Sequence, residues 1–130
     1  MNLHSWGNYP IIENKSFSFK QNETLKAIVR NHIKMIPYGN GRSYGDSALN
    51  KNIINIKPHN YFLNFDESKG LLHIQSGVLL SEILNTIVPK GWFLKITPGT
   101  KLITIGGAIA CDVHGKNHHV EGCLDRKSVV

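Results

Sequence analysis

The chain has 130 residues, of which 41% are hydrophobic and 18% charged, a composition typical of a soluble globular domain that buries a core. It has no run of the roughly 18 apolar residues that a membrane-spanning helix needs, and its first residues lack the basic start and apolar block of a secretion signal. We therefore expect a cytoplasmic protein without a transmembrane segment. Two cysteines, Cys111 and Cys123, form no CxxC pair, which excludes a disulfide framework and favours free thiols.

The positive charge points to an anionic partner. Fifteen Lys and Arg residues against nine Asp and Glu give a formal charge of +6, which suits a phosphate-bearing cofactor, nucleic acid or an acidic surface. The cations are scattered singly, without a basic run or a stripe on a predicted helix, so we expect no nucleic-acid partner.

The first half of the chain begins with an extended segment and continues with a predicted helix in "NETLKAIVRNH", residues 22–32. Its apolar face consists of Leu25, Ile28, Val29 and His32, and Asn22 is the expected N-cap. The stretch "IKMIPY", residues 33–38, then predicts a buried strand that leads into a glycine-rich loop.

Beyond the loop, three short apolar runs predict strands: "NIINI" at 52–56, "YFLNF" at 61–65 and "LLHIQSG" at 71–77, with a turn in "DESKG". A second helix follows in residues 78–92, ended by Pro89 and Gly91; its apolar face comprises Leu80, Ile83, Leu84 and Ile87. One further strand is expected in the Gly- and Thr-rich remainder. This order predicts an α+β fold, a small mixed sheet with helices on one side.

The loop "PYGNGRSYGDS", residues 37–47, suits a pyrophosphate. Its three glycines allow successive backbone N–H groups to point at an anion, and Arg42 and two serines add further donors. An ordinary tight turn is the alternative. A Walker A loop is excluded because no glycine is followed by Lys and then Ser or Thr. A Rossmann turn is excluded because only "DSALNKN" separates the loop from the next strand, too short for a crossover helix.

Together, "GNGRSYGDSAL" and "TPGTKLITIGGAIACDVHGKNHH" resemble the FAD domain of vanillyl-alcohol-oxidase-type (PCMH-type) flavoproteins, most closely the decaprenylphosphoryl-ribose oxidase branch. The resemblance covers roughly residues 17–122. It implies the first half of a PCMH-type FAD-binding domain in an oxidoreductase. Such an enzyme oxidises a CH–OH group of a sugar or polyol, for instance a polyprenyl-phosphate pentose, by hydride transfer to FAD.

The resemblance assigns residues to the cofactor. Many relatives link the flavin to a histidine in the pattern GxGHS, and here Arg42 occupies that position, which implies non-covalent FAD. The implied cofactor-binding residues are Gly39, Asn40, Gly41, Arg42, Ser43 and Tyr44 in the first segment, and Pro98, Gly99, Thr100, Thr104, Gly106, Gly107, Ala108, Cys111, His114 and Gly115 in the second.

By the same resemblance, the catalytic residues are His114 beside the flavin ring, Lys116 as a substrate ligand and Tyr44 in the same pocket. Asn117 and His118 would support them. Solvated loop residues are the alternative interpretation of these side chains.

The segment also allows a different class of function. Cys111, His114, His118 or His119, and Cys123 have the spacing C-x2-H-x3-H-x4-C, loosely that of a zinc site in a small zinc- or nucleic-acid-binding module. The ligand order is not a standard one, and the flavin interpretation also explains the glycines and Asp112. We therefore expect no metal.

Flavoproteins of this type have several hundred residues. The resemblance therefore implies one incomplete FAD-binding domain in residues 1–130, with an N-terminal subdomain over about 1–90, the start of a second over about 91–130, and no substrate domain. A C-terminal half or a partner chain would complete the fold, and residues 1–130 alone would bind FAD weakly and lack oxidase turnover.

Overall fold

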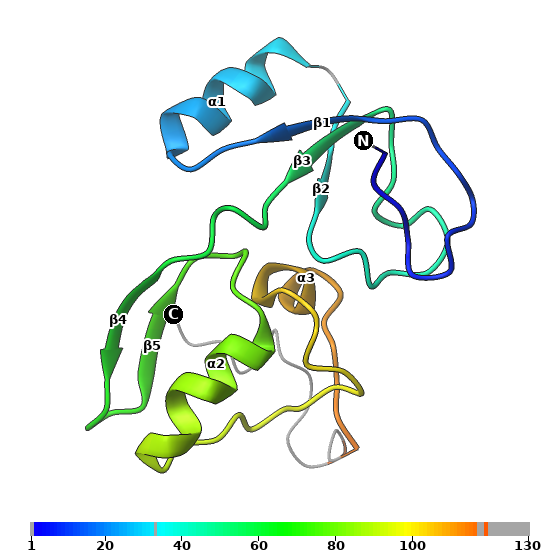
Figure 1. The fold of residues 1–130 in the computed structure, drawn as a ribbon. Coiled ribbons are helices and arrows are strands. Elements are labelled where there is room, and N and C mark those ends of the chain that lie inside the picture. Colours follow the sequence, from blue (N-terminus) through cyan, green and yellow to red (C-terminus); the bar gives the residue numbers. More distant parts are fainter. Residues whose placement is uncertain (1, 33, 117–118, 120–130) are drawn as a thin grey trace. The chain divides into compact units, whose positions relative to one another are not determined.

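The structure, a computed structural model, describes residues 2–32, 34–116 and 119. The chain divides into two compact units, Met1–His59 and Asn60–Val130, each with a sheet of its own (Figure 1). The subdomain boundary expected near residue 90 stays a prediction.

The first unit contains a parallel three-stranded sheet in the order β1-β3-β2. Lys15 of β1 pairs with Asn52 of β3, and Ile36 of β2 pairs with Ile53. Because β2 is an edge strand, Pro37, which has no N–H group to donate, is accommodated there. The elements of this unit are β1 (Lys15–Ser18), α1 (Asn22–Asn31), β2 (Ile36–Tyr38) and β3 (Asn52–Asn55).

Helix α1 forms where the apolar spacing predicts it, but its expected cap is wrong. Asn22 is the first helical residue, and the N-cap is Gln21, whose side chain makes no capping hydrogen bond. The other end is fixed by His32, whose Nδ1 lies 2.8 Å from the carbonyl oxygen of Ile28 and whose ring packs on Phe17 with 4.4 Å between centroids. His32 therefore ends the helix as its C-cap.

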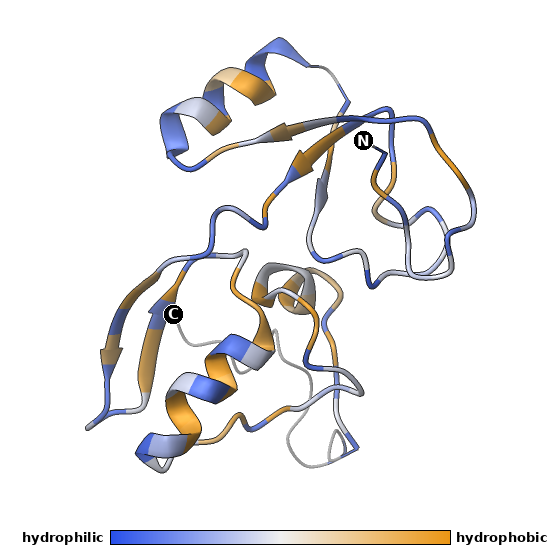
Figure 2. Cartoon of the chain, viewed as in Figure 1, coloured by the Kyte–Doolittle hydropathy of each residue, from blue (hydrophilic) through white to orange (hydrophobic). Residues whose placement is uncertain are grey.

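The core of the first unit lies around β3 and both ends of the glycine-rich loop. Tyr38, Leu49 and Ile53 are buried together, and Ile53 is 0% exposed, a burial that stabilises the fold by about 2 kcal/mol. Figure 2 shows the apolar middle of β3. Because Tyr38 lies near the start of the loop and Leu49 just after its end, both ends of the loop are anchored in the core.

The second unit contains the antiparallel hairpin β4–β5 and helices on either side of a long irregular stretch. The predicted hairpin and second helix are confirmed, and so is the α+β class. The five strands lie in two small sheets, one parallel and one antiparallel. The elements of this unit are β4 (Phe62–Asp66), β5 (Leu71–Ile74), α2 (Leu80–Ile87), the 3₁₀ turn η1 (Val88–Lys90) and α3 (Ile105–Ala110).

Helix α2 provides the core of the second unit. Its buried residues, Leu80, Ile83 and Ile87, pack with Val78, and its polar residues alternate with this apolar face (Figure 2). The helix ends as predicted, because η1 includes a proline and Gly91 adopts the left-handed conformation, with φ of 82°.

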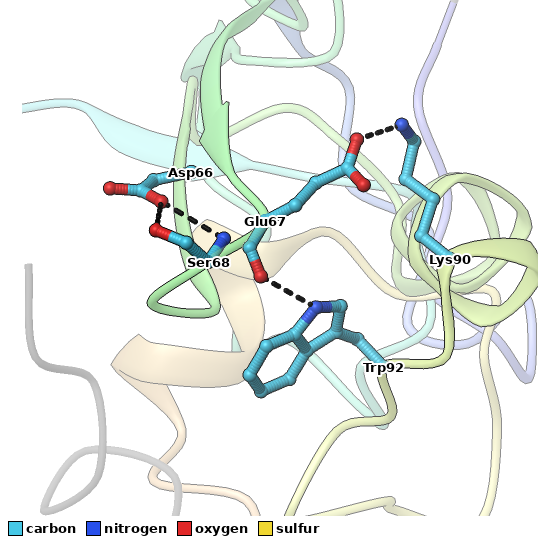
Figure 3. A network of polar contacts seen from close by, with 5 residues as sticks. All are labelled: Asp66, Glu67, Ser68, Lys90 and Trp92. Carbon is cyan, nitrogen blue, oxygen red and sulfur yellow. Dashed lines mark hydrogen bonds and ion pairs between the residues drawn. The ribbon is translucent and has the colours of Figure 1, made fainter.

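The tip of the hairpin is attached to the segment that follows α2 (Figure 3). Trp92 Nε1 donates to the carbonyl oxygen of Glu67 at 3.0 Å, and the Glu67 side chain forms an ion pair with Lys90. Asp66 accepts from the hydroxyl of Ser68 at 2.6 Å, and this hydrogen bond is the main reason that the pKa of Asp66 lies below its usual value. These contacts connect the turn to the segment that follows α2.

The strand expected after the second helix is wrong. Leu79 and Thr104 form a single isolated bridge, and "IGGAIA" is the short helix α3. The β-branched residues Ile103 and Thr104 favour a strand locally, but the hydroxyl of Thr104 accepts the N–H of Gly107 at 3.1 Å and starts a helix instead. Within the described ranges, no helix has the length and apolar character needed to cross a membrane.

Candidate functional site

The glycine-rich loop leads from β2 to β3, two neighbouring parallel strands of the first sheet, without a helix between them. Residues 39–51 follow β2 and form turns and bends only, which confirms that the loop is not a Rossmann turn. Gly41 and Gly45 have φ of 67° and 56°, values that residues with a Cβ atom rarely adopt. The sequence thus uses glycine where the chain must turn sharply.

An N-terminal segment, residues 2–14, packs against this loop. The Tyr38 hydroxyl donates to the carbonyl oxygen of His4 at 2.5 Å, and the N–H of Trp6 donates to the carbonyl oxygen of Ser43 at 3.0 Å. The guanidinium of Arg42 lies over the Trp6 ring, 4.7 Å from its centroid, within the range of a cation–π interaction. The loop is therefore held from outside as well as by its own turns.

The segment and the loop line an open pocket of about 450 Å³. Six of its lining residues come from the segment and the remainder from β2 and the loop, so neither part forms it alone. The lining residues are Asn2, Leu3, His4, Ser5, Trp6, Asn8, Tyr38, Asn40, Gly41 and Arg42.

Arg42 gives this pocket its positive charge. Its Nε is buried and has no hydrogen-bond acceptor among the residues that the structure describes, so the guanidinium keeps donor capacity that the protein does not use. Burial raises the pKa of the nearby Tyr38, while its hydrogen bond to His4 and the charge of Arg42 act in the opposite direction. A cation with an unused donor in a pocket fits an anionic group such as a pyrophosphate.

Tyr44 lies apart from this pocket. Its ring is 76% exposed and is not among the lining residues, and its carbonyl oxygen accepts from the hydroxyl of Ser47 at 3.0 Å. Of the other predicted residues in the loop, Asn40 and Gly41 line the pocket, while Gly39 and Ser43 are half-buried. The structure thus gathers part of the predicted set around one cavity and leaves Tyr44 in solvent.

The second glycine-rich segment, residues 97–116, belongs to the other unit and has a different local structure. Pro98 is half-buried, Gly99 and Thr100 are exposed, and the Thr100 hydroxyl accepts the N–H of Leu102 at 3.1 Å. This turn leads to Thr104, which is buried and caps α3.

The N–H groups that begin α3 all donate within the protein. Ala108, at the centre of this helix, is fully buried, so the segment is packed as well as hydrogen bonded. Contact of this segment with a cofactor would therefore depend on close approach and shape and not on these donors. The four hydrogen bonds are Ile105 N–H to Val78 at 2.8 Å, Gly106 N–H to Ser76 at 2.9 Å, Gly107 N–H to the Thr104 hydroxyl at 3.1 Å, and Ala108 N–H to the Thr104 carbonyl at 2.9 Å.

The remaining predicted residues follow α3. Cys111, the C-cap of α3, is exposed and its thiol is free; His114 and Lys116 are also exposed, and Gly115 is buried. Asn117 lies outside the described residues, and so do two of the residues of the zinc alternative, His118 and Cys123. Among the described residues, no three His, Cys, Asp or Glu side chains come together as metal ligands. The catalytic roles stay predictions.

Sequence reasoning did not identify the N-terminal segment as part of a site. The stretch "HSWGNYP" has no periodicity and no known motif, and its relation to Arg42 depends on a chain reversal that no local pattern reports. An isolated tryptophan in a polar, irregular segment is the one signal present in the sequence.

These features define a class of protein: a mixed α and β fold in which a glycine-rich turn and a half-buried arginine form a pocket suited to an anionic group. Residues 20–127 match the family described as FAD binding domain, and the chain belongs to that family.

Two curated relatives show what the chain is similar to. Decaprenylphosphoryl-beta-D-ribose oxidase of Mycolicibacterium smegmatis is 40% identical over 90 residues, which are 68% of this chain and 20% of that protein. D-lactate dehydrogenase of Anaerostipes hadrus is 29% identical over 108 residues, 78% of this chain and 23% of that protein. The chain thus spans about a fifth of the length of these relatives.

Solved structures support the fold. Cholesterol oxidase from B. sterolicum superposes with a TM-score of 0.75 at 14% identity, over 88% of this chain and 24% of the other. An alkyldihydroxyacetonephosphate synthase superposes with a TM-score of 0.71 at 20% identity, over 85% and 23%. At such identities the similarity concerns the fold.

Proposed function

We propose that this chain is the FAD-binding part of a flavin-dependent oxidoreductase that oxidises a CH–OH group of a sugar or polyol. The observation that carries the proposal is the glycine-rich loop of a FAD binding domain whose Arg42 has a buried donor beside a pocket, without an acceptor among the described residues. The sugar class follows the relative named an oxidase of a decaprenylphosphoryl ribose. The relative named a dehydrogenase of D-lactate supports oxidation of a CH–OH group only.

In this proposal the loop binds the pyrophosphate of FAD. The left-handed glycines bring the backbone close to the phosphate oxygens, and Arg42 compensates their negative charge. A second set of residues would contact FAD through shape, since the N–H groups that begin α3 already have partners. This set comprises Pro98, Gly99, Thr100, Thr104, Gly106, Gly107 and Ala108. When bound, FAD supplies the acceptor for a hydride, and the protein supplies orientation and water exclusion.

The proposed catalytic residues lie in both units. His114 would lie beside the flavin ring, while the exposed ammonium group of Lys116 would bind an anionic or hydroxylated substrate. The exposed ring of Tyr44 is available for contact with the substrate. A sugar-type small molecule is the expected ligand of these side chains, and the cytoplasm is the expected compartment.

The binding of FAD is proposed to be non-covalent. A guanidinium stays protonated throughout the physiological pH range and is a poor nucleophile, so Arg42 cannot form the bond that a histidine forms at this position in the flavin-linked enzymes that the sequence resembles. The cofactor is therefore expected to leave the protein on denaturation.

The test uses the intact protein, purified and denatured with acid. We expect flavin absorbance before denaturation and all of the flavin, as FAD, in the filtrate afterwards. Arg42→Gln, which removes a charged donor, should raise the dissociation constant of FAD by about tenfold. Absence of flavin together with no binding at millimolar FAD would contradict the proposed function, whereas flavin retained on the denatured protein would contradict only the non-covalent part.

The substrate class is tested with the FAD-loaded protein under anaerobic conditions. A panel of sugars, polyols and D-lactate is added, and bleaching of the flavin absorbance reports reduction. Bleaching by a sugar or polyol supports the proposal. Bleaching by D-lactate alone would replace the proposed substrate class.

A further inference from the structure

We propose that Trp6 is a positioning residue that holds Arg42 and the glycine-rich loop in the conformation that binds FAD, an inference that rests on the proposed function. Trp6 belongs to the segment before β1 and lies outside residues 20–127, the part that matches the FAD binding domain family. The family match alone therefore assigns it no role.

Trp6 contacts the loop at two adjacent residues through two different groups. Its backbone N–H donates to the carbonyl oxygen of Ser43 at 3.0 Å. Its indole ring lies against the guanidinium of Arg42, with 4.7 Å between the guanidinium carbon and the ring centroid. The hydrogen bond between the two backbones positions the indole, and the indole in turn positions the guanidinium.

Arg42 needs a contact that orders its guanidinium because its side chain is long and flexible. A free arginine side chain samples many rotamers, and ordering it on binding costs affinity. Arg42 keeps a buried Nε without an acceptor among the described residues, so hydrogen bonds of the protein do not hold that part of the guanidinium. The face of the Trp6 ring is the group that orders it before the cofactor arrives.

The same contact is not needed for the core. The Trp6 side chain is 54% exposed, and the core of this unit consists of Tyr38, Leu49 and Ile53 with the residues that pack on them. Removal of the indole therefore leaves no buried cavity. A loss of FAD affinity that exceeds the loss of stability is what distinguishes positioning from a general structural role.

The experiment is a double-mutant cycle in the intact protein, with the dissociation constant of FAD measured by titration of the apoprotein. Trp6→Ala should raise this constant about two- to fivefold, the range of a cation–π contact at a partly exposed site. Trp6→Phe, which keeps a ring face, should restore most of the affinity. In an Arg42→Gln background, Trp6→Ala should have no further effect.

A matched control is Tyr9→Ala in the same segment. Because Tyr9 is 79% exposed, this substitution should leave the dissociation constant of FAD unchanged. Thermal unfolding of the apoproteins is recorded in parallel. The inference is overturned if Trp6→Ala leaves FAD affinity unchanged, if its effect persists in the Arg42→Gln background, or if the loss of affinity only follows a loss of thermal stability. If the unmodified protein binds no FAD, the proposed function fails. If it binds FAD and Trp6→Ala gives one of the results above, only the inference about Trp6 fails, so the two failures are distinguishable.

Discussion

The two glycine-rich segments of this chain have similar composition and different structures. In the loop at 39–47, two glycines adopt left-handed conformations, and the buried Nε of Arg42 has no acceptor in the part of the chain that the structure describes. In the segment at 97–116, the residues around Gly106 and Gly107 form a capped helix whose first N–H groups all donate within the protein. Glycine content alone therefore does not define an anion site. The state of the nearby donors, the Arg42 side chain in one segment and the N–H groups that begin α3 in the other, distinguishes the two segments.

The largest expected effect is at Gly41. An added Cβ there would meet the Tyr38 hydroxyl and lie 3.0 Å from the carbonyl oxygen of His4, in a residue with φ of 67°. Gly41→Ala should lower the free energy of unfolding by about 3 kcal/mol, since the conformational cost and the overlap add. Chemical denaturation measures the change.

Gly45→Ala is the matched control, because Gly45 has a similar φ of 56° and an added Cβ there would have no atom of the described residues within 4 Å. We expect a loss of about 1 kcal/mol there, from conformation alone. Equal losses at both positions would mean that the close approach of the N-terminal segment does not constrain the loop.

A third glycine, outside both segments, calibrates this effect. An added Cβ at Gly70 would lie 2.6 Å from the ring of Trp92, and its φ is 66°. Gly70→Ala should cost about 2 kcal/mol, less than Gly41→Ala because a partly exposed side chain can move while a backbone carbonyl cannot. In a Trp92→Ala background the cost should fall to about 1 kcal/mol. Full additivity in thermal or chemical denaturation would contradict the steric explanation.

Thr104 tests the second segment. Thr104→Val keeps the shape of the side chain but removes the acceptor for the N–H of Gly107, so we expect a loss of about 1.5 kcal/mol of stability. The dissociation constant of FAD in the intact protein should change less than twofold. Thr100→Val, in an exposed turn of the same segment, should cost less than about 0.5 kcal/mol. A large change in affinity without a change in stability would assign α3 a direct role in cofactor binding.

The smallest expected effect is a pH dependence that comes from Tyr38. Because burial raises the pKa of Tyr38 above 10.0, the folded protein holds this proton more tightly than the unfolded chain. The contribution of the Tyr38 proton to the free energy of unfolding is therefore complete below pH 10. It decreases as the pH rises through the raised pKa of Tyr38.

Tyr38→Phe removes both this titration and the hydrogen bond to His4. At pH 7 the variant should be about 1 kcal/mol less stable than the unmodified protein. The difference should decrease above pH 10 in a series of denaturation curves. A difference that grows with pH would contradict the raised pKa.

Local patterns predicted most of the fold. The apolar spacing of Leu80, Ile83 and Ile87 and the short runs on either side of "DESKG" depend on neighbours in sequence, so α2 and the hairpin could be predicted. Helix α3 could not, because its start depends on the carbonyl groups of Ser76 and Val78 as well as on its cap. A tertiary contact overrides the strand preference of the β-branched residues there.

The candidate site was predictable to the same extent. The glycines and Arg42 of the first loop form a motif that can be found by inspection of the sequence, and Gly41 and Arg42 line a pocket. The other half of that pocket could not be found, because the contact between Trp6 and Arg42 joins residues far apart along an irregular chain. The exposure of Tyr44 also follows from the path of the loop, which composition does not determine.

The strand order β1-β3-β2 determines when the first sheet can pair during synthesis, because the central strand is the last of the three in sequence. Strand β1 has no partner until β3 leaves the ribosome, because its register joins Lys15 to Asn52. The hairpin β4–β5, by contrast, pairs residues across a short turn and closes as soon as it is made. Pairing between distant residues is slow relative to hairpin closure. The unit that emerges first is therefore the one whose sheet depends on non-local contacts, and β1 cannot pair in it before β3 has been made.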